Sequence, residues 1–140
     1  MERRLFIKTT CTLCVALGAG LTVASFSSCA SIPVYAASVS RKRIAVPLSI
    51  FGEQNVQIVR ANELEYDIAL RKESDGRYTA LLLRCTHASN PLTVTESGFV
   101  CPLHGSRFGV GGDVTHGPAT IALKQLATSI EDDKIVIALE

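Results

Sequence analysis

The chain has 140 residues, and its 14 lysines and arginines nearly balance its 13 aspartates and glutamates. This balance leaves no strongly basic surface, which argues against a nucleic-acid partner, and the length predicts one domain plus a short extra segment. The hydrophobic residues, 47% of the chain, are unevenly spread. Residues 9–37 contain no charged side chain, whereas the sequence beyond Arg41 has a mixed composition. We therefore expect an export signal or membrane anchor at residues 1–37 and a folded domain at residues 38–140.

The N-terminal segment begins with a charged stretch typical of export signals. The run Arg-Arg-Leu-Phe-Ile-Lys, which starts at Arg3, resembles the twin-arginine signal, whose pathway carries proteins that are already folded. The alternative is the ordinary positively charged start of a signal peptide. Export would place the domain on the periplasmic side of the cytoplasmic membrane or in the cell envelope.

The segment can end in three ways. The first is lipidation at Cys29, which ends a sequence that resembles a bacterial lipobox. The second is cleavage after Ala36, and the third is no cleavage, because residues 9–28 could just span a bilayer. We expect the first, so that the protein is anchored to the membrane by lipid. Cys11 and Cys14 form a C-x-x-C within the apolar stretch, and we interpret them as part of the signal.

Beyond the segment, apolar runs separated by turn residues predict short β-strands and no long helix. Asp75-Gly76 and residues 131–133 lie between neighbouring runs, and each predicts a hairpin turn. These patterns predict an all-β fold, an antiparallel β sandwich or barrel, with a small metal-bearing lobe at residues 85–119. The predicted strands lie at residues 44–50, 56–60, 67–71, 78–83, 98–100, 123–130 and 134–139.

Two of the three histidines each stand close to a cysteine, as Cys85 with His87 and Cys101 with His104. Two cysteines in an oxidising compartment would by default form a disulfide, but a disulfide needs no histidines. Four such side chains could hold a zinc ion, or a [2Fe-2S] cluster with the cysteines on one iron and the histidines on the other. Because each pair mixes the two residue types, the spacing favours the cluster over a structural zinc site.

These motifs resemble the two cluster-binding loops of Rieske iron–sulfur proteins. The match consists of Cys-Thr-His at residues 85–87 and Cys-Pro-Leu-His-Gly-Ser at residues 101–106. It continues through residues 107–108, 112–114 and 117–119, the last being similar to the proline-containing loop that covers the cluster, and spans most of residues 45–140. The resemblance implies a Rieske-like β fold with a [2Fe-2S] cluster. The implied ligands are Cys85, His87, Cys101 and His104, with Ser106 bonding a bridging sulfide.

Two departures from the respiratory members of that family bear on the reduction potential. Asn90 and Leu103 stand where those proteins have a bracing disulfide, and Phe108 stands where they have a tyrosine that bonds a cysteine ligand. Only the serine, Ser106, is kept. Fewer hydrogen bonds stabilise the reduced charge less, so we expect a potential in the middle or lower part of the family range of roughly −150 to +300 mV.

The resemblance implies an electron-transfer protein or redox-complex subunit rather than a self-contained enzyme. We expect an exported, membrane-tethered one-electron carrier whose exposed His87 and His104 contact a redox partner protein and couple electron uptake to proton uptake. One alternative is a subunit of a quinol-oxidising, cytochrome bc-type complex, and another is a zinc- or disulfide-stabilised interaction domain. His116 has no matching role, and we interpret it as an ordinary loop residue.

Overall fold

The computed structural model describes residues 32–139. The predicted export signal, with Cys11, Cys14 and Cys29, lies outside these residues. Within them the chain forms β-strands and one short 3-10 helix, which confirms the predicted all-β class. Among residues 32–139 no helix has the length and apolar character needed to cross a membrane.

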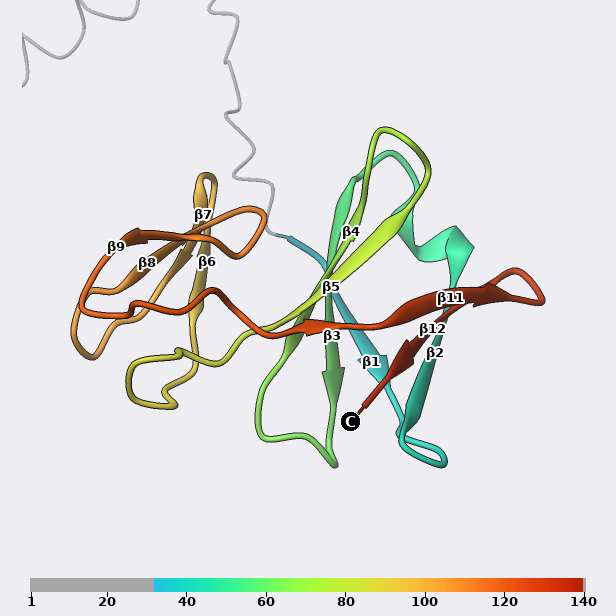
Figure 1. Cartoon of the computed structure of the whole chain (residues 1–140). Helices are drawn as coiled ribbons and strands as arrows, with labels where there is room; N and C mark the ends of the chain where they lie inside the picture. Colours follow the sequence, from blue (N-terminus) through green and yellow to red (C-terminus); the bar gives the residue numbers. More distant parts are fainter. Residues whose placement is uncertain (1–31, 140) are drawn as a thin grey trace, which may run out of the picture. The chain divides into compact units, whose positions relative to one another are not determined.

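The strands form three sheets, and all their pairings are antiparallel except the parallel pair of β1 with β3 (Figure 1). The five-stranded sheet has the order β1 (Val34–Ala37), β3 (Val56–Ala61), β4 (Ile68–Lys72), β5 (Tyr78–Leu82) and β10 (Gln125–Leu126). The three-stranded sheet has the order β11 (Thr128–Glu131), β12 (Lys134–Ala138) and β2 (Arg43–Pro47). The four-stranded sheet has the order β6 (Thr93–Thr95), β7 (Gly98–Val100), β8 (Arg107–Gly109) and β9 (Val114–His116). We call the first two sheets the base, and we call residues 85–121, which contain the third sheet and the loops beside it, the lobe.

Five of the predicted strands correspond to β3, β4, β5, β7 and β12, with ends that differ by at most one residue. Both predicted hairpin turns are also present. Gly76 joins β4 to β5 with a φ of 83°, in the left-handed region that glycine enters at little cost. Asp132 and Asp133 join β11 to β12 with φ of 46° and 59°, the pair of positive angles found in tight two-residue turns.

Two predicted strands were wrong in extent. The strand predicted at residues 44–50 ends at Pro47, and the chain continues as a 3-10 helix, Leu48–Phe51, which turns Phe51 into the core. The side-chain amide of Gln57 donates to the Ile50 carbonyl oxygen (2.8 Å) and holds this helix on β3. The strand predicted at residues 123–130 is two strands, because the chain passes at Ala127 from the five-stranded sheet to the three-stranded one.

Four strands, β1, β6, β8 and β9, were not predicted. Each has three or four residues, and three of them belong to the lobe. Such short segments contain too few residues to display a clear alternation of apolar and polar side chains. Their pairing depends on neighbours that are distant in sequence, as β1 shows by lying beside β3.

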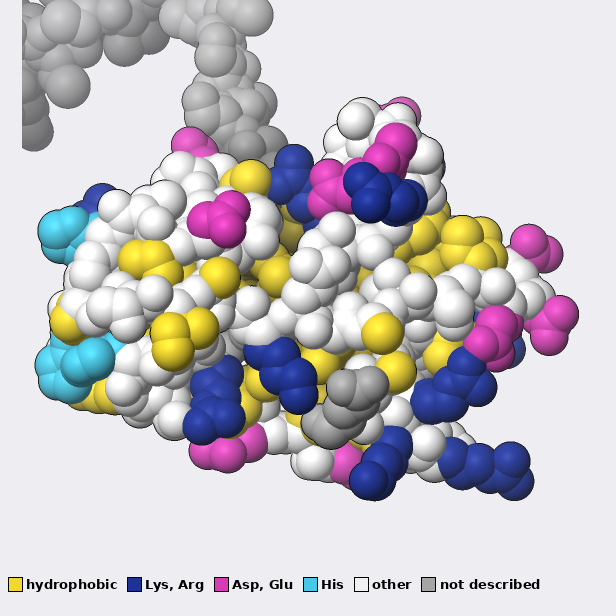
Figure 2. Space-filling view, viewed as in Figure 1, with side chains coloured by type: hydrophobic (Ala, Val, Ile, Leu, Met, Phe, Trp, Pro, Cys, Tyr) yellow, Lys and Arg dark blue, Asp and Glu magenta, His cyan; other side chains and the backbone are white. Residues whose placement is uncertain are grey.

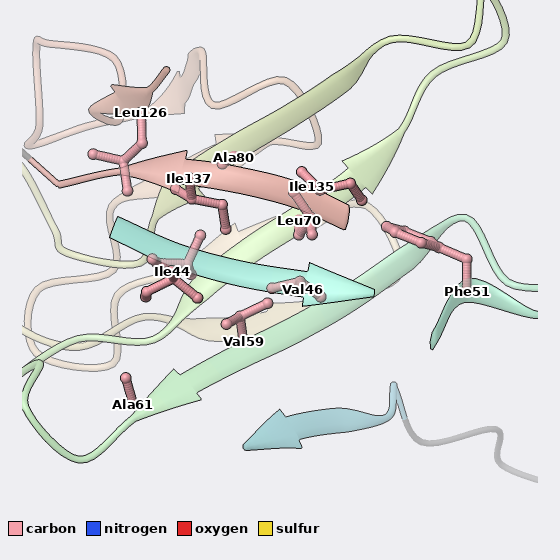
Figure 3. Close-up of a cluster of buried hydrophobic side chains, with 11 residues drawn as sticks. Ile44, Val46, Phe51, Val59, Ala61, Leu70, Ala80, Leu126, Ile135 and Ile137 are labelled. Atoms are coloured by element: carbon pink, nitrogen blue, oxygen red, sulfur yellow. The ribbon is translucent and has the colours of Figure 1, made fainter. Parts of the chain in front are cut away.

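The core of the base lies between the five-stranded and three-stranded sheets. Side chains from both sheets point into the same space in Figure 3, with β2 and β12 opposite β3 and β4. Burial of this apolar surface is the main favourable contribution to folding of the base. The buried residues are Ile44, Val46, Phe51, Val59, Ala61, Ile68, Leu70, Ala80, Leu126, Ile135 and Ile137.

The five-stranded sheet is apolar on both faces. Successive residues of a strand point to opposite sides of its sheet. Leu70 therefore belongs to the core of the base, whereas its neighbour Ala69 belongs to a second core under the lobe. Ile58, Leu81 and Leu83 also contribute to this second core. The second core further contains Cys85, Phe99, Cys101, Phe108, Ala119 and Leu123.

Candidate metal centre

Two loops of the same backbone design carry the predicted site. Loop 1 (residues 85–90) follows β5, and loop 2 (residues 101–106) joins β7 to β8. In each loop the cysteine N–H donates to the carbonyl oxygen five residues later (2.8 Å in both), and the N–H four residues later donates to the cysteine carbonyl oxygen (2.9 and 3.0 Å). The residue in this fourth position has a positive φ in both loops, 51° at Ser89 and 79° at Gly105.

The loops bring together the four predicted ligands as two like pairs. Cys85 and Cys101 are free thiols, each only 1% exposed, and their side chains lie within hydrogen-bonding reach of each other. His87 and His104 are exposed, and their ring centres are 5.1 Å apart in an edge-to-face arrangement. Histidine side chains are visible at the surface of the lobe in Figure 2. The site therefore has a buried sulfur side and an exposed nitrogen side.

Hydrogen bonds converge on the Cys85 sulfur. Burial raises the pKa of the Cys85 thiol, but backbone N–H groups of His87 and Ala88, aided by the side chains of Cys101 and Ser106, lower the pKa below its usual value. Donors around a sulfur favour the thiolate, the form that binds metals. The turn of loop 1 thus favours the thiolate form of Cys85, which is the form that can bind a metal.

A third segment, residues 117–121, contacts both loops. The Ser106 hydroxyl is fully buried, and its oxygen accepts a hydrogen bond from the backbone N–H of Ala119 (3.0 Å). On the other side, the Thr86 hydroxyl donates to the carbonyl oxygen of Ile121 (2.6 Å). One segment therefore holds loop 1 and loop 2 at a fixed separation. It contains the Gly117-Pro118 peptide, which is cis.

The residues singled out as departures occupy distinct places. Phe108 is buried in the second core, and its ring has no hydroxyl group to offer a sulfur ligand. Leu103 is 54% exposed on loop 2, and the Asn90 side chain donates to the carbonyl oxygen of Pro91 (3.1 Å). His116, on β9, is exposed and faces Arg107 of β8 in the lobe sheet.

Sequence reasoning missed three residues around loop 1. Tyr66, Arg84 and Ser89 contact one another at the outer side of this loop. Tyr66 comes from the connection between β3 and β4, about twenty residues before loop 1, so no local motif links it to the site. Only the fold brings it there.

Comparison with known proteins identifies the family. The family model of the Rieske [2Fe-2S] domain matches residues 38–127 of the chain. The chain belongs to this family. The cofactor of this Rieske domain is therefore a [2Fe-2S] cluster, rather than the zinc ion or disulfide that the sequence left as alternatives.

Curated relatives of the Rieske domain include cyanobacterial proteins. The chain is 44% identical over 88 residues to the cytochrome b6-f complex iron-sulfur subunit of Nostoc punctiforme. The aligned residues cover 61% of this chain and 49% of that protein. It is 46% identical over 55 residues to the corresponding subunit of Synechococcus elongatus, which covers 37% of this chain and 31% of that protein. The chain thus spans half or less of the length of these relatives.

Solved structures share the fold of the Rieske domain. The cyanobacterial plasma membrane Rieske protein PetC3 from Synechocystis PCC 6803 matches with a TM-score of 0.53 and 23% identity, over 66% of this chain and 94% of that one. A phenanthrene-bound mutant of naphthalene 1,2-dioxygenase matches with a TM-score of 0.55 and 20% identity, over 71% of this chain and 26% of that one. At these identities the likeness concerns the fold alone.

The donor set of the Rieske domain fits its cofactor. A cluster of this type has two cysteines on one iron and two histidines on the other, so each iron takes only two ligands from the protein. Within residues 32–139, no group of three or more His, Cys, Asp or Glu side chains is placed to hold a single metal ion. The separate Cys85/Cys101 and His87/His104 pairs match the division that two irons require.

Proposed function

We propose that this Rieske domain is a one-electron carrier whose cluster is held by the sulfurs of Cys85 and Cys101 and by ring nitrogens of His87 and His104. When bound, the cluster accepts and releases one electron. The observation that carries the proposal is the division of the site into a buried thiol pair and an exposed imidazole pair. A carrier needs one side that excludes water and another that a partner can approach.

The chain's own residues have separate tasks in this proposal. Backbone N–H groups of loop 1 favour the thiolate of Cys85, and the apolar second core keeps water from both sulfurs. The exposed imidazoles offer a redox partner protein a short path to the cofactor, because they are both ligands and surface groups.

The groups around the sulfurs support a potential in the middle or lower part of the family range of roughly −150 to +300 mV. Ser106 supplies a buried hydroxyl beside Cys85, whereas Phe108 supplies none. Hydrogen bonds to sulfur stabilise the extra negative charge of the reduced state and raise the potential. With one such hydroxyl, the reduced state is stabilised less than it would be with two.

We further propose that residues 1–37 export and anchor the protein at the periplasmic side of the cytoplasmic membrane or in the cell envelope, with residues 38–140 as the Rieske domain. The twin-arginine-like run supports transport in the folded state, which suits a protein that carries its cluster with it. Lipidation at Cys29 would provide the anchor. Intact mass of the mature protein tests this, because a lipidated Cys29, a cut after Ala36 and an uncut chain have different masses.

A second candidate function is a Rieske subunit of a quinol-oxidising complex. It is favoured by the 44% identity to a protein whose name places it in the cytochrome b6-f complex. In that case an exposed histidine ligand would accept hydrogen from quinol, a reaction that needs a high potential. A potential near the top of the family range, together with copurification of cytochrome subunits, would favour this role over the independent carrier.

The test of the main proposal is spectroscopic and analytical. The full-length protein is purified, its iron and acid-labile sulfide are quantified, and the EPR spectrum of the dithionite-reduced sample is recorded. We expect two irons and two sulfides per chain and a lower average g value than an all-cysteine cluster gives. Colourless protein without iron, or a spectrum typical of four cysteine ligands, would contradict the proposed ligand set.

A further inference from the structure

We propose that Tyr66, Arg84 and Ser89 form a polar brace that fixes the conformation of loop 1 and thereby positions Cys85 and His87 for the cluster. The three are positioning residues, because none of them is among the proposed ligands. The inference rests on the ligand roles proposed above. It assigns to these residues a task that no sequence motif indicated.

The brace is a closed set of contacts. Arg84 donates to the Ser89 hydroxyl oxygen from Nε (3.1 Å) and from Nη2 (2.6 Å). Tyr66 donates from its hydroxyl to the Ser89 carbonyl oxygen (2.6 Å), and the Arg84 guanidinium carbon lies 5.8 Å from the centre of the Tyr66 ring. Each member therefore contacts the other two. Donation by an ionised group and the cation–π contact make such a set stronger than neutral hydrogen bonds alone.

The backbone at Ser89 shows why the loop needs these contacts. Ser89 has a φ of 51°, a left-handed conformation that non-glycine residues adopt only at a cost. The equivalent position of loop 2 is Gly105, which reaches its φ of 79° with little strain. A serine at this position therefore has a higher conformational energy than a glycine would have. The two hydrogen bonds from Arg84 to the Ser89 hydroxyl offset this cost.

Fixing Ser89 fixes the part of loop 1 that faces the cofactor. The Ser89 N–H donates to the Cys85 carbonyl oxygen (2.9 Å), which closes the turn around His87 and Ala88. The backbone N–H groups of those two residues are the ones aimed at the Cys85 sulfur. Both described cysteines are free thiols, so no covalent crosslink between them shares this task. Holding the Ser89 end therefore helps this turn keep its shape, in addition to the Cys85–Asn90 backbone hydrogen bond and the Thr86–Ile121 hydrogen bond.

The first test compares Tyr66→Phe with Thr128→Val in the full-length protein. Both changes remove one hydroxyl that donates to a backbone carbonyl oxygen, at 2.6 Å in the brace and at 2.7 Å, toward Tyr78, in the base. We expect similar shifts of the denaturation midpoint. We expect only Tyr66→Phe to change the EPR spectrum and to speed cluster loss, by roughly two- to tenfold, the factor that one net hydrogen bond represents. Equal cluster-loss rates in the two variants would overturn the brace.

The second test measures the rate of cluster loss in Ser89→Gly, for which backbone strain and the brace predict opposite changes. This change relieves the left-handed strain but removes the hydroxyl that accepts from Arg84. If the backbone alone shaped loop 1, Ser89→Gly would slow cluster loss. The brace predicts faster loss and faster amide hydrogen exchange across residues 85–90. Slower loss with unchanged exchange would refute the inference.

The two proposals can fail separately. Amide exchange of residues 85–90 is also measured in cluster-free wild-type, Tyr66→Phe and Thr128→Val proteins. Faster exchange in Tyr66→Phe alone supports the brace even if wild-type protein proves to lack iron, a result that would contradict only the ligand proposal. Unchanged exchange in all three proteins would contradict the brace and leave the ligand proposal standing.

Discussion

The base and the lobe are held together by different forces. The base has strands of up to six residues and a core of aliphatic and aromatic side chains. Each lobe strand has three residues, and the core beneath the lobe includes two thiols next to a buried serine. Side-chain hydrogen bonds to backbone groups hold the loops of the lobe. Burial of apolar surface is thus the main force that stabilises the base, whereas the lobe depends more on polar contacts and on a cofactor that binds only the folded state.

Removing a proposed sulfur ligand should give the largest difference between the base and the lobe. Cys101→Ser should abolish most or all cluster binding, because a serine hydroxyl loses its proton far less readily than a thiol and is a much weaker ligand for iron. Amide exchange in β12 should stay slow, because this strand lies in the core of the base. Iron and sulfide analysis reads the first effect and hydrogen exchange the second. If the amide hydrogens of β12 exchanged as fast as those of β7 in this variant, the stability of the base would depend on the lobe. That result would contradict the difference drawn here between the two regions.

Two glycines, one in the lobe and one in the base, differ in how closely other backbone atoms approach them. A Cβ added at Gly98 in the lobe would overlap the Phe108 carbonyl oxygen, and the φ of 140° at Gly98 is unfavourable for other residues. Gly76, in a turn of the base, has a φ of 83° and nothing within 4 Å of an added Cβ. We expect Gly98→Ala to eliminate most cluster binding. Gly76→Ala should cost only the conformational strain, about 1–2 kcal/mol. Equal cluster yields from both variants would show that β7 and β8 can separate.

A substitution in the core of the base should lower the stability of the protein without changing the properties of the cluster. Ile135 is fully buried in the core of the base, and Ile135→Ala should lower the free energy of unfolding by about 2–5 kcal/mol through lost burial and the cavity left behind. In the fraction that remains folded, the visible spectrum and the potential should equal those of the wild type. Urea denaturation and redox titration measure the two. A shifted potential would mean that the core of the base tunes the site directly.

Ser106 both supports the structure of the lobe, through its bond from Ala119, and contacts the proposed ligand Cys85. Ser106→Ala leaves the buried N–H of Ala119 without its acceptor and removes the hydroxyl beside Cys85. We expect a stability loss of about 1–3 kcal/mol and a lower potential, with about 60 mV for each tenfold change in the one-electron equilibrium. Ser129→Ala, which removes an exposed hydroxyl in the base, is the matched control. A potential unchanged by Ser106→Ala would contradict the role given to this hydroxyl.

The smallest effect should come from the exposed turn of the base. The Arg77 backbone N–H and then its side chain lower the pKa of Asp75 below the usual 3.8. The stability that Asp75 contributes is thus present above its unfolded-state pKa and is lost as the pH falls through the lower folded-state pKa. Between pH 6 and pH 3, urea midpoints should fall slightly more for the wild type than for Asp75→Asn. A larger fall in the variant would reverse the sign and contradict this assignment.

The sequence predicted the base better than the lobe for a physical reason. Strands such as β3, β4 and β12 contain enough apolar residues to be recognised, because each has three consecutive residues that are buried by long-range packing. The two Cys/His motifs were visible because metal ligation restricts residue types and spacing within a few positions. Their grouping into a thiol pair and an imidazole pair was anticipated from the mixed motifs and is present in the structure.

What the sequence could not predict depends on contacts between distant segments. Tyr66 reaches Ser89 across 23 residues, and Thr86 reaches Ile121 across 35. No periodicity or local spacing encodes either contact. The same applies to β1, which pairs in parallel with β3. A parallel pair is not joined by a tight turn, so no local turn signal in the sequence indicates it.

The sheet with two apolar faces limits how the molecule can respond to an added electron. Leu81 packs under the lobe while its neighbour Ala80 packs into the base, so a tilt of one layer against the other would disturb dense packing on both sides. The packing on both faces of this sheet therefore resists rocking of the lobe against the base. Structural rearrangement on reduction should stay within loops 1 and 2, and a small rearrangement of this kind favours rapid exchange of electrons with any partner that docks.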